Sequence, residues 1–552
     1  MNMVYAFTLP TTSPLSFQSF ITSSTHSSLP QSASTARHAL RLALKAHKRL
    51  PRPRQDAHLP TVLAALNDYI PYLFAISRGL NGRSVHTDTY STPQDGYTTG
   101  GPNLRTEEVD ITSHAELESA WRNTLSSSGG LSIATEGLRT RNGRVSGRGI
   151  HFELGFTLTT LGYVLSRMAR AEVLASLYAS STPTAEERTA AMQTATRYLL
   201  QASSVHNLLA SSPSLTAAVS PAPELDPATQ SALASLALAE ATLLAVLKDD
   251  AYVAACIQSR NPNDTEWMVH APEIPKVRAL LFARLCVRAA EYAEQAAAGL
   301  GAVGSTSNRA GRVDDDLVRY TGVLARVARG RACRFFGVDA ELSGRVGEGI
   351  AWLRAARTPL GLRGAGPSRD EGAGSGSSAK GGLSRLKREW TERREDRRVA
   401  KDAGGSRSEK GPLDAGDDAG RCEEGRVIAM LETKWEKMND TVSSNSIFSC
   451  DRMRFEIARF IDSIQINTQI IPPSAPLLSN LPSGRDIHSP PAPYQPPSLD
   501  EDQLMRMRAP PDERNDVQFG GSDSEDEAVQ SDHRGPPGGF PDRSATASSV
   551  YY

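Results

Sequence analysis

The chain has 552 residues, of which 39% are hydrophobic and 6% aromatic. Its 61 lysines and arginines are balanced by 62 aspartates and glutamates, so its formal net charge is −1. This balance lacks the concentrated positive charge that nucleic-acid binding needs. The length is sufficient for several domains' worth of hydrophobic core.

The five cysteines are widely spaced and form no Cys-x-x-Cys pair, which is typical of reduced thiols in a cytosolic protein. The first ten residues, MNMVYAFTLP, lack a charged region followed by an apolar run, so we expect no secretory signal peptide. No window of about 18 uninterrupted apolar residues occurs, so we expect no membrane span and, at most, a peripheral membrane contact.

The N-terminal region changes character at about residue 33. Residues 1–32 are rich in Ser, Thr and Pro, and we predict that they are flexible. Apolar spacing then predicts a helix over 34–49 and another over 60–79, which Pro71 would kink or split. The first helix carries a row of basic residues that indicates either a solvated face or a contact with anionic lipid: Arg37, Arg41, Lys45 and Lys48.

The predicted domain core spans residues 33–360. Residues 106–150 favour a small β-sheet, and the chain is strongly helical from Ile150 onward. Thr184 and Glu187 have the spacing of a capping box at the start of a helix. The acidic run that begins at Asp314 indicates another helix start, where carboxylates are favourable against the helix dipole.

The stretch from Asp226 to Gly299 has the clearest pattern in the chain. Asp226 is a natural N-cap, Pro227 fits the first helical turn, and Leu and Ala then recur at helical spacing. A second helix is predicted after Pro275, with Leu280 among the inward-facing residues. Two helices faced with Ala and Leu can pack closely, as in helical arrays that bind partners on their helix faces.

The composition changes again after residue 360. Residues 361–425 are a charged, Gly-rich linker or insertion, within which 383–401 could form a solvated helix. Residues 426–469 resume the helical domain. Residues 470–552 are Pro-rich and acidic, and they cannot bury enough apolar surface to fold alone, so we predict a disordered tail.

No catalytic constellation is recognisable, because the chain lacks a GxSxG, an HExxH, a Walker loop and a dinucleotide fingerprint. We therefore predict a protein that is not an enzyme and has no cofactor and no metal site. The most distinctive loop carries Asp264, Glu266, Trp267 and His270. We interpret it as structural, whereas a deep polar pocket there would indicate an enzyme.

Long stretches of the chain resemble the Bro-one (Alix-like) domain family, in its fungal branch that acts in ambient-pH signalling. They span residue 7 to about residue 510 and include FTLPTTSPLSF, ALNDYIPYL, SALASLALAEATLLAVLKDD, RNPNDTEWMVHAPEIPKVRALLFARLC, KWEKMNDT and PSGRDIHSP. The resemblance implies a mainly α, curved domain with a tetratricopeptide-like helical core, a small β-sheet and a disordered C-terminal tail.

The resemblance also implies a function. Proteins of this kind are cytoplasmic adaptors, recruited to endosomes or cortical plasma-membrane sites, that bind the C-terminal amphipathic helix of an ESCRT-III core subunit. They help to recruit the machinery for proteolytic activation of a zinc-finger transcription factor. The family's partner groove is an apolar patch on the helical core, so our candidate groove residues are Leu236, Leu243, Leu244 and Leu247.

Other partners follow less directly. The same resemblance allows further pH-signalling components at the plasma membrane, and we expect no nucleic-acid partner. The alternative function is a general helical-repeat scaffold in endosomal trafficking, although no repeat of about 34 residues is visible.

The family-like text is interrupted between KWEKMNDT and INTQIIPP. The intervening 24 residues run from Val442 to Gln465. Val442-Ser443 can be encoded by GTGAGT and Gln465 by CAG, which are intron boundary sequences. We hypothesise that this segment is a retained intron in the predicted gene.

Overall fold

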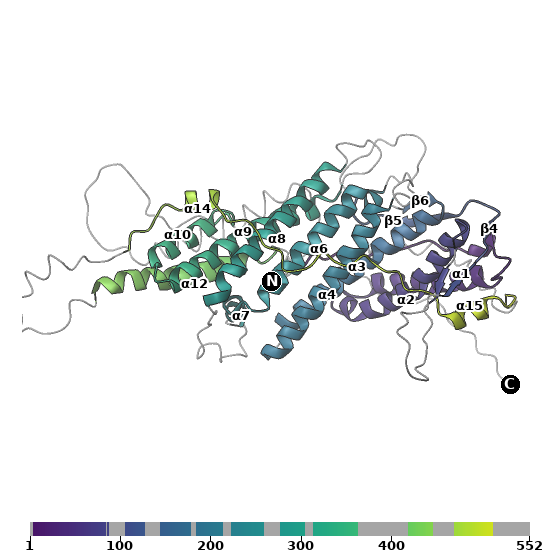
Figure 1. Cartoon of the computed structure of the whole chain (residues 1–552), viewed down its shortest axis with the longest axis horizontal. Helices are drawn as coiled ribbons and strands as arrows, with labels where there is room; N and C mark the ends of the chain where they lie inside the picture. The colour runs from purple at the N-terminus through teal and green to yellow at the C-terminus, as the bar shows by residue number, and fades with distance from the viewer. Residues whose placement is uncertain are drawn as a thin grey trace, which may run out of the picture. The chain divides into compact units, whose positions relative to one another are not determined.

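The computed structural model of the chain describes residues 4–83, 85–87, 105–126, 144–177, 184–212, 222–258, 276–303, 313–362, 418–444 and 469–511. Helices dominate these residues and strands are short (Figure 1). The predicted mainly α fold with small β-sheet regions is therefore confirmed. The predicted helix over 383–401 lies outside the described residues.

The principal helices, in chain order, are α1 (Leu29–Arg49), α2 (Arg52–Leu80), α3 (Ile150–Leu177), α4 (Ala185–Ser211), α6 (Pro227–Leu247), α7 (Ala251–Gln258), α8 (Lys276–Ala302), α9 (Asp315–Leu342), α10 (Val346–Arg357) and α12 (Arg421–Ser444). Two short helices, α14 (Ala475–Ser479) and α15 (Glu501–Met507), lie near the C-terminal end of the described chain. Single 3-10 turns occur at η1 (Phe17–Ser19) and η3 (Pro223–Leu225).

Consecutive helices pack against one another in chain order. α1 contacts α2, α2 contacts α3, and the series continues through α4, α6, α8, α9 and α10 to α12. Short connections contribute where they occur, as between α1 and α2 and between α9 and α10, whereas α2 and α3 pack together although residues 81–149 separate them. α6 consequently lies between α4 and α8, with much of its surface covered by these two helices.

The strands form three separate antiparallel pairs. β1 (Ile21–Thr22) pairs with β4 (Thr112–Ser113), β2 (Val85–Thr87) with β3 (Arg105–Glu107), and β5 (Glu118–Arg122) with β6 (Arg144–Arg148). In the last pair Trp121 lies opposite Val145, and both side chains are buried. The predicted sheet is thus a set of two-stranded ribbons that cover one end of the helical series.

The N-terminal segment is packed on the helices, which corrects the prediction that residues 1–32 are flexible. Phe7 and Phe17 are 3% and 0% exposed. Phe7 stacks on Tyr163 of α3, with ring centroids 4.6 Å apart. The segment's polar groups are satisfied by other elements, as where the Arg122 N–H donates to the Thr11 carbonyl at 2.9 Å. The Ser- and Thr-rich composition therefore hid a buried segment.

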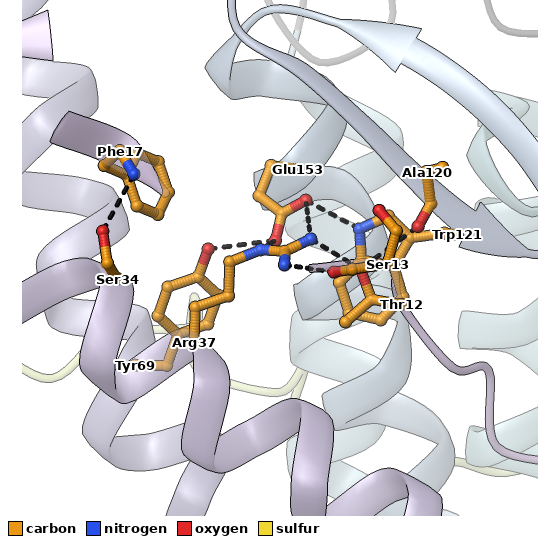
Figure 2. A network of polar contacts seen from close by, with 9 residues as sticks. All are labelled: Thr12, Ser13, Phe17, Ser34, Arg37, Tyr69, Ala120, Trp121 and Glu153. Atoms are coloured by element: carbon orange, nitrogen blue, oxygen red, sulfur yellow. Dashed lines mark hydrogen bonds and ion pairs between the residues drawn. The ribbon is translucent and has the colours of Figure 1, made fainter. Parts of the chain in front are cut away.

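A buried hydrogen-bond network centred on one ion pair joins α1, α2, α3 and β5 (Figure 2). Arg37 Nε donates to Glu153 Oε1 at 2.8 Å, and the two side chains are 1% and 0% exposed. The Tyr69 hydroxyl donates to the same oxygen at 2.9 Å, and Trp121 Nε1 donates to Glu153 Oε2 at 2.7 Å. Burial raises the pKa of Glu153, but the Arg37 charge and these donors outweigh it, so that pKa is lowered.

This network also corrects the basic face predicted on the first helix. Arg37 is buried in its ion pair with Glu153, and Arg41 is only 7% exposed. Of the four basic residues, Lys45 is half-buried and Lys48 is exposed. The lipid contact considered for the row as a whole is therefore not available to Arg37 and Arg41.

A second buried ion-pair network fixes α12 to α9. Arg334 contacts Asp250 and Glu424 at 2.5 Å each, and Arg331 contacts Glu424 at 3.0 Å, with all four side chains at 0%. Burial raises the pKa of Glu424, whereas the two guanidinium groups lower it by more. Residues 421–425, predicted as the end of a linker, thus belong to the start of α12, where Glu423 and Glu424 are buried.

Two predicted helix starts are confirmed. The Glu187 N–H donates to Thr184 Oγ1 at 3.2 Å, while the Thr184 N–H donates to Glu187 Oε2 at 2.9 Å, which completes a capping box. At the start of α9 the Asp316 N–H donates to Asp314 Oδ1 at 3.2 Å. Both caps depend on local spacing alone, which is why the sequence reveals them.

Residues 469–511, here called the strap, run along the helical series as the yellow-green segment in Figure 1. This corrects the predicted disordered tail over 470–511. Leu499, Leu504 and Met507 are 2%, 0% and 3% exposed. The composition indicates that the strap cannot fold alone, but the helices supply a surface against which it can. The rest of the predicted tail, 512–552, lies outside the described residues.

Two helices, α2 and α6, are long and apolar enough to cross a membrane by composition. In α6, 83% of the apolar window is buried inside the fold. A helix that is apolar on all sides is equally typical of the core of a large protein. α2 continues through Pro60 and Pro71, so Pro71 does not split the helix predicted over 60–79.

Candidate partner-binding surface

The predicted groove residues lie in the hydrophobic core. Leu236, Leu243, Leu244 and Leu247 are 1%, 0%, 0% and 2% exposed. Asp226 caps α6 as predicted, since its Oδ1 accepts from the Ala228 N–H at 2.8 Å. The helix is therefore where the sequence places it, but these four side chains present no open surface.

Sequence reasoning could not assign the outward face of α6, because the helix is apolar all round. Beyond the exposed first turn at Pro227 and Ala228, the positions that are not buried are Ser231, Leu238 and Ala245, which are seven residues apart and follow one line along the helix. Leu280 of α8, predicted to face inward, is 46% exposed, while Leu285 is 1% exposed. The predicted inward positions Leu285 and Ala289 are thus buried, whereas the prediction for Leu280 was wrong.

A cavity of about 220 Å³ lies between α4, α6 and the strap. It brings together one predicted residue, Leu244, with seven that the sequence did not single out: Met192, Gln193, Thr196, Ala245, Lys248, Ile487 and His488. An apolar cavity of about 150 Å³ is enough to hold benzene. This cavity can therefore accept an apolar side chain of a partner.

The strap is held over this cavity by contacts with α8. The Arg485 N–H donates to the Arg284 carbonyl at 3.1 Å. The next residue, Asp486, accepts from Arg288 Nε and from the Tyr292 hydroxyl, both at 2.7 Å. The Arg288 guanidinium also lies 4.4 Å from the centroid of the Tyr292 ring. Hydrogen bonds from these two groups outweigh desolvation, so the pKa of Asp486 is lowered.

Gly484 allows the strap to approach α8 this closely. A Cβ at this position would lie 2.7 Å from the Arg288 backbone nitrogen and from its Cα. Because these atoms belong to a helix backbone, they cannot move aside. The stretch PSGRDIHSP therefore contacts the helices directly. Gly484 and Asp486 pack on α8, and Ile487 and His488 line the cavity.

α6 also holds a buried carboxyl that the sequence analysis missed. Glu240 is 1% exposed, and its Oε1 accepts from the Tyr5 N–H at 2.9 Å and from the Tyr320 hydroxyl at 3.0 Å. Burial raises the pKa of Glu240 to about 8. The carboxyl therefore fastens the N-terminal segment to α6 and α9, mainly in its protonated form at neutral pH.

No group of three or more potential metal-ligating side chains occurs among the residues that the structure describes. The loop residues Asp264, Glu266, Trp267 and His270 lie outside them. The buried carboxylates of Glu153, Glu240, Asp250 and Glu424 are used in the contacts given above, to arginine, tyrosine, tryptophan or backbone N–H donors. In the described ranges the polar network therefore links elements of the fold.

Solved structures similar to this chain include the following three. A complex of ALIX BRO1 with CHMP4C is 13% identical, with a TM-score of 0.46 over 89% of this chain and 96% of that chain. A Bro1 domain structure concerned with endosomal targeting is 14% identical, with a TM-score of 0.40 over 86% and 94%. ALIX in complex with a SIVmac239 late domain is 12% identical, with a TM-score of 0.48 over 92% of this chain and 51% of that chain.

No protein-family model matches the chain. Among curated proteins, the pH-response regulator protein palC of Emericella nidulans is 56% identical over 558 aligned residues, which cover 100% of both chains. The aligned region covers the whole length of both chains. The chain therefore belongs to the palC family of pH-response regulators.

Proposed function

We propose that this pH-response regulator is a non-enzymatic adaptor that binds the C-terminal amphipathic helix of an ESCRT-III core subunit. The observation that carries the proposal is the full-length identity to palC, together with the partner that the sequence resemblance implies. In this role the protein is cytoplasmic and is recruited to endosomes or to cortical sites at the plasma membrane. There it helps to recruit the machinery for proteolytic activation of a zinc-finger transcription factor.

The cavity beside Leu244 supports this function as the place of contact. Its walls combine the apolar residues Met192, Leu244 and Ala245 of α4 and α6 with polar residues of α4 and with one cation, Lys248. An amphipathic helix binds a groove of this kind through apolar anchors on one face, with charged residues at the rim. We therefore propose the cavity lined by Leu244 as the partner-binding surface, in place of the four buried leucines.

A variant that fills the cavity tests the proposal. Ala245 is half-buried, so Ala245→Arg should block the cavity while the helix still forms. Ala228→Arg places the same side chain at an exposed position of the same helix and is the matched control. Binding of a labelled ESCRT-III C-terminal helix peptide is measured by fluorescence anisotropy, and folding by thermal denaturation.

We expect the wild type and Ala228→Arg to bind and Ala245→Arg to lose at least about tenfold in affinity. A folded wild-type protein that binds none of the ESCRT-III peptides would contradict the adaptor function. Equal binding by both variants would place the contact elsewhere on the protein. Binding only to other trafficking proteins would favour the general scaffold instead.

A further inference from the structure

Three adjacent strap residues show what the α4–α6–α8 surface recognises. Asp486 gives its carboxylate to Arg288 and Tyr292 of α8. Ile487 and His488 then line the cavity together with residues of α4 and α6. The surface therefore has a cationic subsite and an apolar subsite side by side, and the strap occupies both.

The strap fills the apolar subsite poorly. Ile487 remains 46% exposed, although it lines the cavity. The cavity of about 220 Å³ that it lines therefore stays partly open to solvent. An apolar side chain that entered the cavity fully would bury more surface than Ile487 does, and burial of apolar area is the main favourable term in such contacts.

The charges around the strap favour an acidic ligand. Arg284 and Arg288 contact the strap, and Lys248 lies at the cavity. Glu291 already accepts from Arg288 Nη1 at 2.8 Å, which leaves the Arg288 Nε edge for the strap carboxylate. A ligand that offers one carboxylate and one apolar side chain close together would match both subsites.

We propose that the partner helix and strap residues 482–488 compete for this one surface. The partner is an acidic amphipathic helix: one of its carboxylates replaces Asp486 at Arg288 and Tyr292, and one apolar side chain enters the cavity that Ile487 lines. The inference rests on the proposed adaptor function and adds to it the chemistry of the ligand and the segment that must leave. Residues three or four apart on a helix are close enough to present both groups.

Two strap variants should release the surface without changing the helices. Asp486→Ala removes the acceptor of both α8 hydrogen bonds, and Gly484→Val introduces a side chain where the α8 backbone leaves no room. Arg485→Ala is the matched control, because the described contact of Arg485 with α8 uses its backbone N–H. Hydrogen exchange at strap amides establishes whether each variant opens the strap.

Affinity is measured for a labelled ESCRT-III helix peptide and for the same peptide with its acidic residues replaced by the corresponding amides. We expect both release variants to bind the acidic peptide about 3- to 10-fold more tightly than wild type. In these variants the strap occupies the surface in a smaller fraction of the molecules. Arg485→Ala should bind like wild type. Arg288→Gln also opens the strap but should not bind more tightly, because the partner carboxylate has lost its donor.

The outcomes separate this inference from the adaptor function. If the wild type binds, Ala245→Arg does not, and the release variants match wild type, the function stands and competition with the strap is overturned. An amide peptide that binds as tightly as the acidic one would overturn the cationic subsite. If exchange shows an unchanged strap in both release variants, the docking contacts do not hold it. If no form binds any peptide, the adaptor function itself fails.

Discussion

Asn439 and Gln469 are 30 positions apart in the sequence and hydrogen-bonded in both directions. The Gln469 N–H donates to Asn439 Oδ1 at 3.2 Å, and Asn439 Nδ2 donates to the Gln469 carbonyl at 3.4 Å. The strap therefore begins in contact with the last third of α12, five residues before that helix ends at Ser444. Residues 445–468 lie outside the described part of the chain.

This closeness gives a prediction for the segment hypothesised to be a retained intron. A chain without Val442–Gln465 still has five residues between Asn439 and Gln469, and each can span about 3.3–3.6 Å. We expect this deletion variant to fold, with a melting temperature within about 2 °C of wild type. Transcript sequencing should show the shorter message. A large loss of stability, or most reads carrying the segment, would contradict the hypothesis.

The buried pair Arg37–Glu153 should be costly to break from one side. Arg37→Met leaves the Glu153 carboxylate without its cation, and removing one partner of a buried pair typically costs about 3–5 kcal/mol. The double variant Arg37→Met/Glu153→Leu should lose less, because no uncompensated charge remains. Urea denaturation gives the free energies of unfolding. If the double variant loses as much free energy of unfolding as Arg37→Met and Glu153→Leu lose together, the two residues do not act as a pair.

Glu240 should make the stability pH-dependent on the alkaline side. Its folded pKa of about 8 lies above the ordinary value of 4.5, so the folded state binds the proton more tightly than the unfolded state. Its contribution is present below about pH 4.5 and lost as pH rises through about 8. The free energy of unfolding should therefore fall by up to roughly 4–5 kcal/mol between about pH 5 and about pH 9.

Glu240→Gln keeps the acceptor oxygen for Tyr5 and Tyr320 but cannot ionise, so it should lack this slope. Glu294→Gln, on an exposed ion pair with Arg329, is the control and should keep it. Chemical denaturation across the pH range is the measurement. A slope that persists in Glu240→Gln would assign the pH dependence to another group.

Gly162 should be needed where α3 meets α4. An added Cβ would lie 2.4 Å from His206 Nε2, and that ring is held by Gln230 through a contact of 2.7 Å to Nδ1. Gly162→Ala should therefore destabilise by about 1–3 kcal/mol. Gly322→Ala, in α9 with nothing within 4 Å of the added carbon, should stabilise by about 0.4–1 kcal/mol. Equal changes in the free energy of unfolding for Gly162→Ala and Gly322→Ala would show that α3 and α4 can adjust to the added carbon.

Local chemistry made parts of the fold predictable. Asp226 and the Thr184–Glu187 box mark helix starts through contacts within three residues of sequence. The outward face of α6 was not predictable, because Leu on every side of the helix gives no direction to the periodicity. The burial of Arg37 was also hidden, since its partner is 116 positions away.

The strap and the N-terminal segment escaped prediction for the same physical reason. Their composition correctly indicates that they cannot form a core of their own. Whether such a segment packs on another part of the chain depends on contacts that are distant in sequence, such as Asp486 with Arg288 across 198 positions. The Pro-rich text alone contains no information about the surface that receives it.

The strap also changes how the helical series should unfold. In a linear stack each helix touches only its neighbours, so the stack can melt piece by piece from its ends. Here Gln469 accepts from the Gly347 N–H in α10, while the Met507 carbonyl accepts from the Ser28 N–H beside α1. The strap thus connects α10, late in the stack, with the start of α1, at its beginning, through one continuous segment. Fraying at either end strains the other, which favours a single cooperative transition.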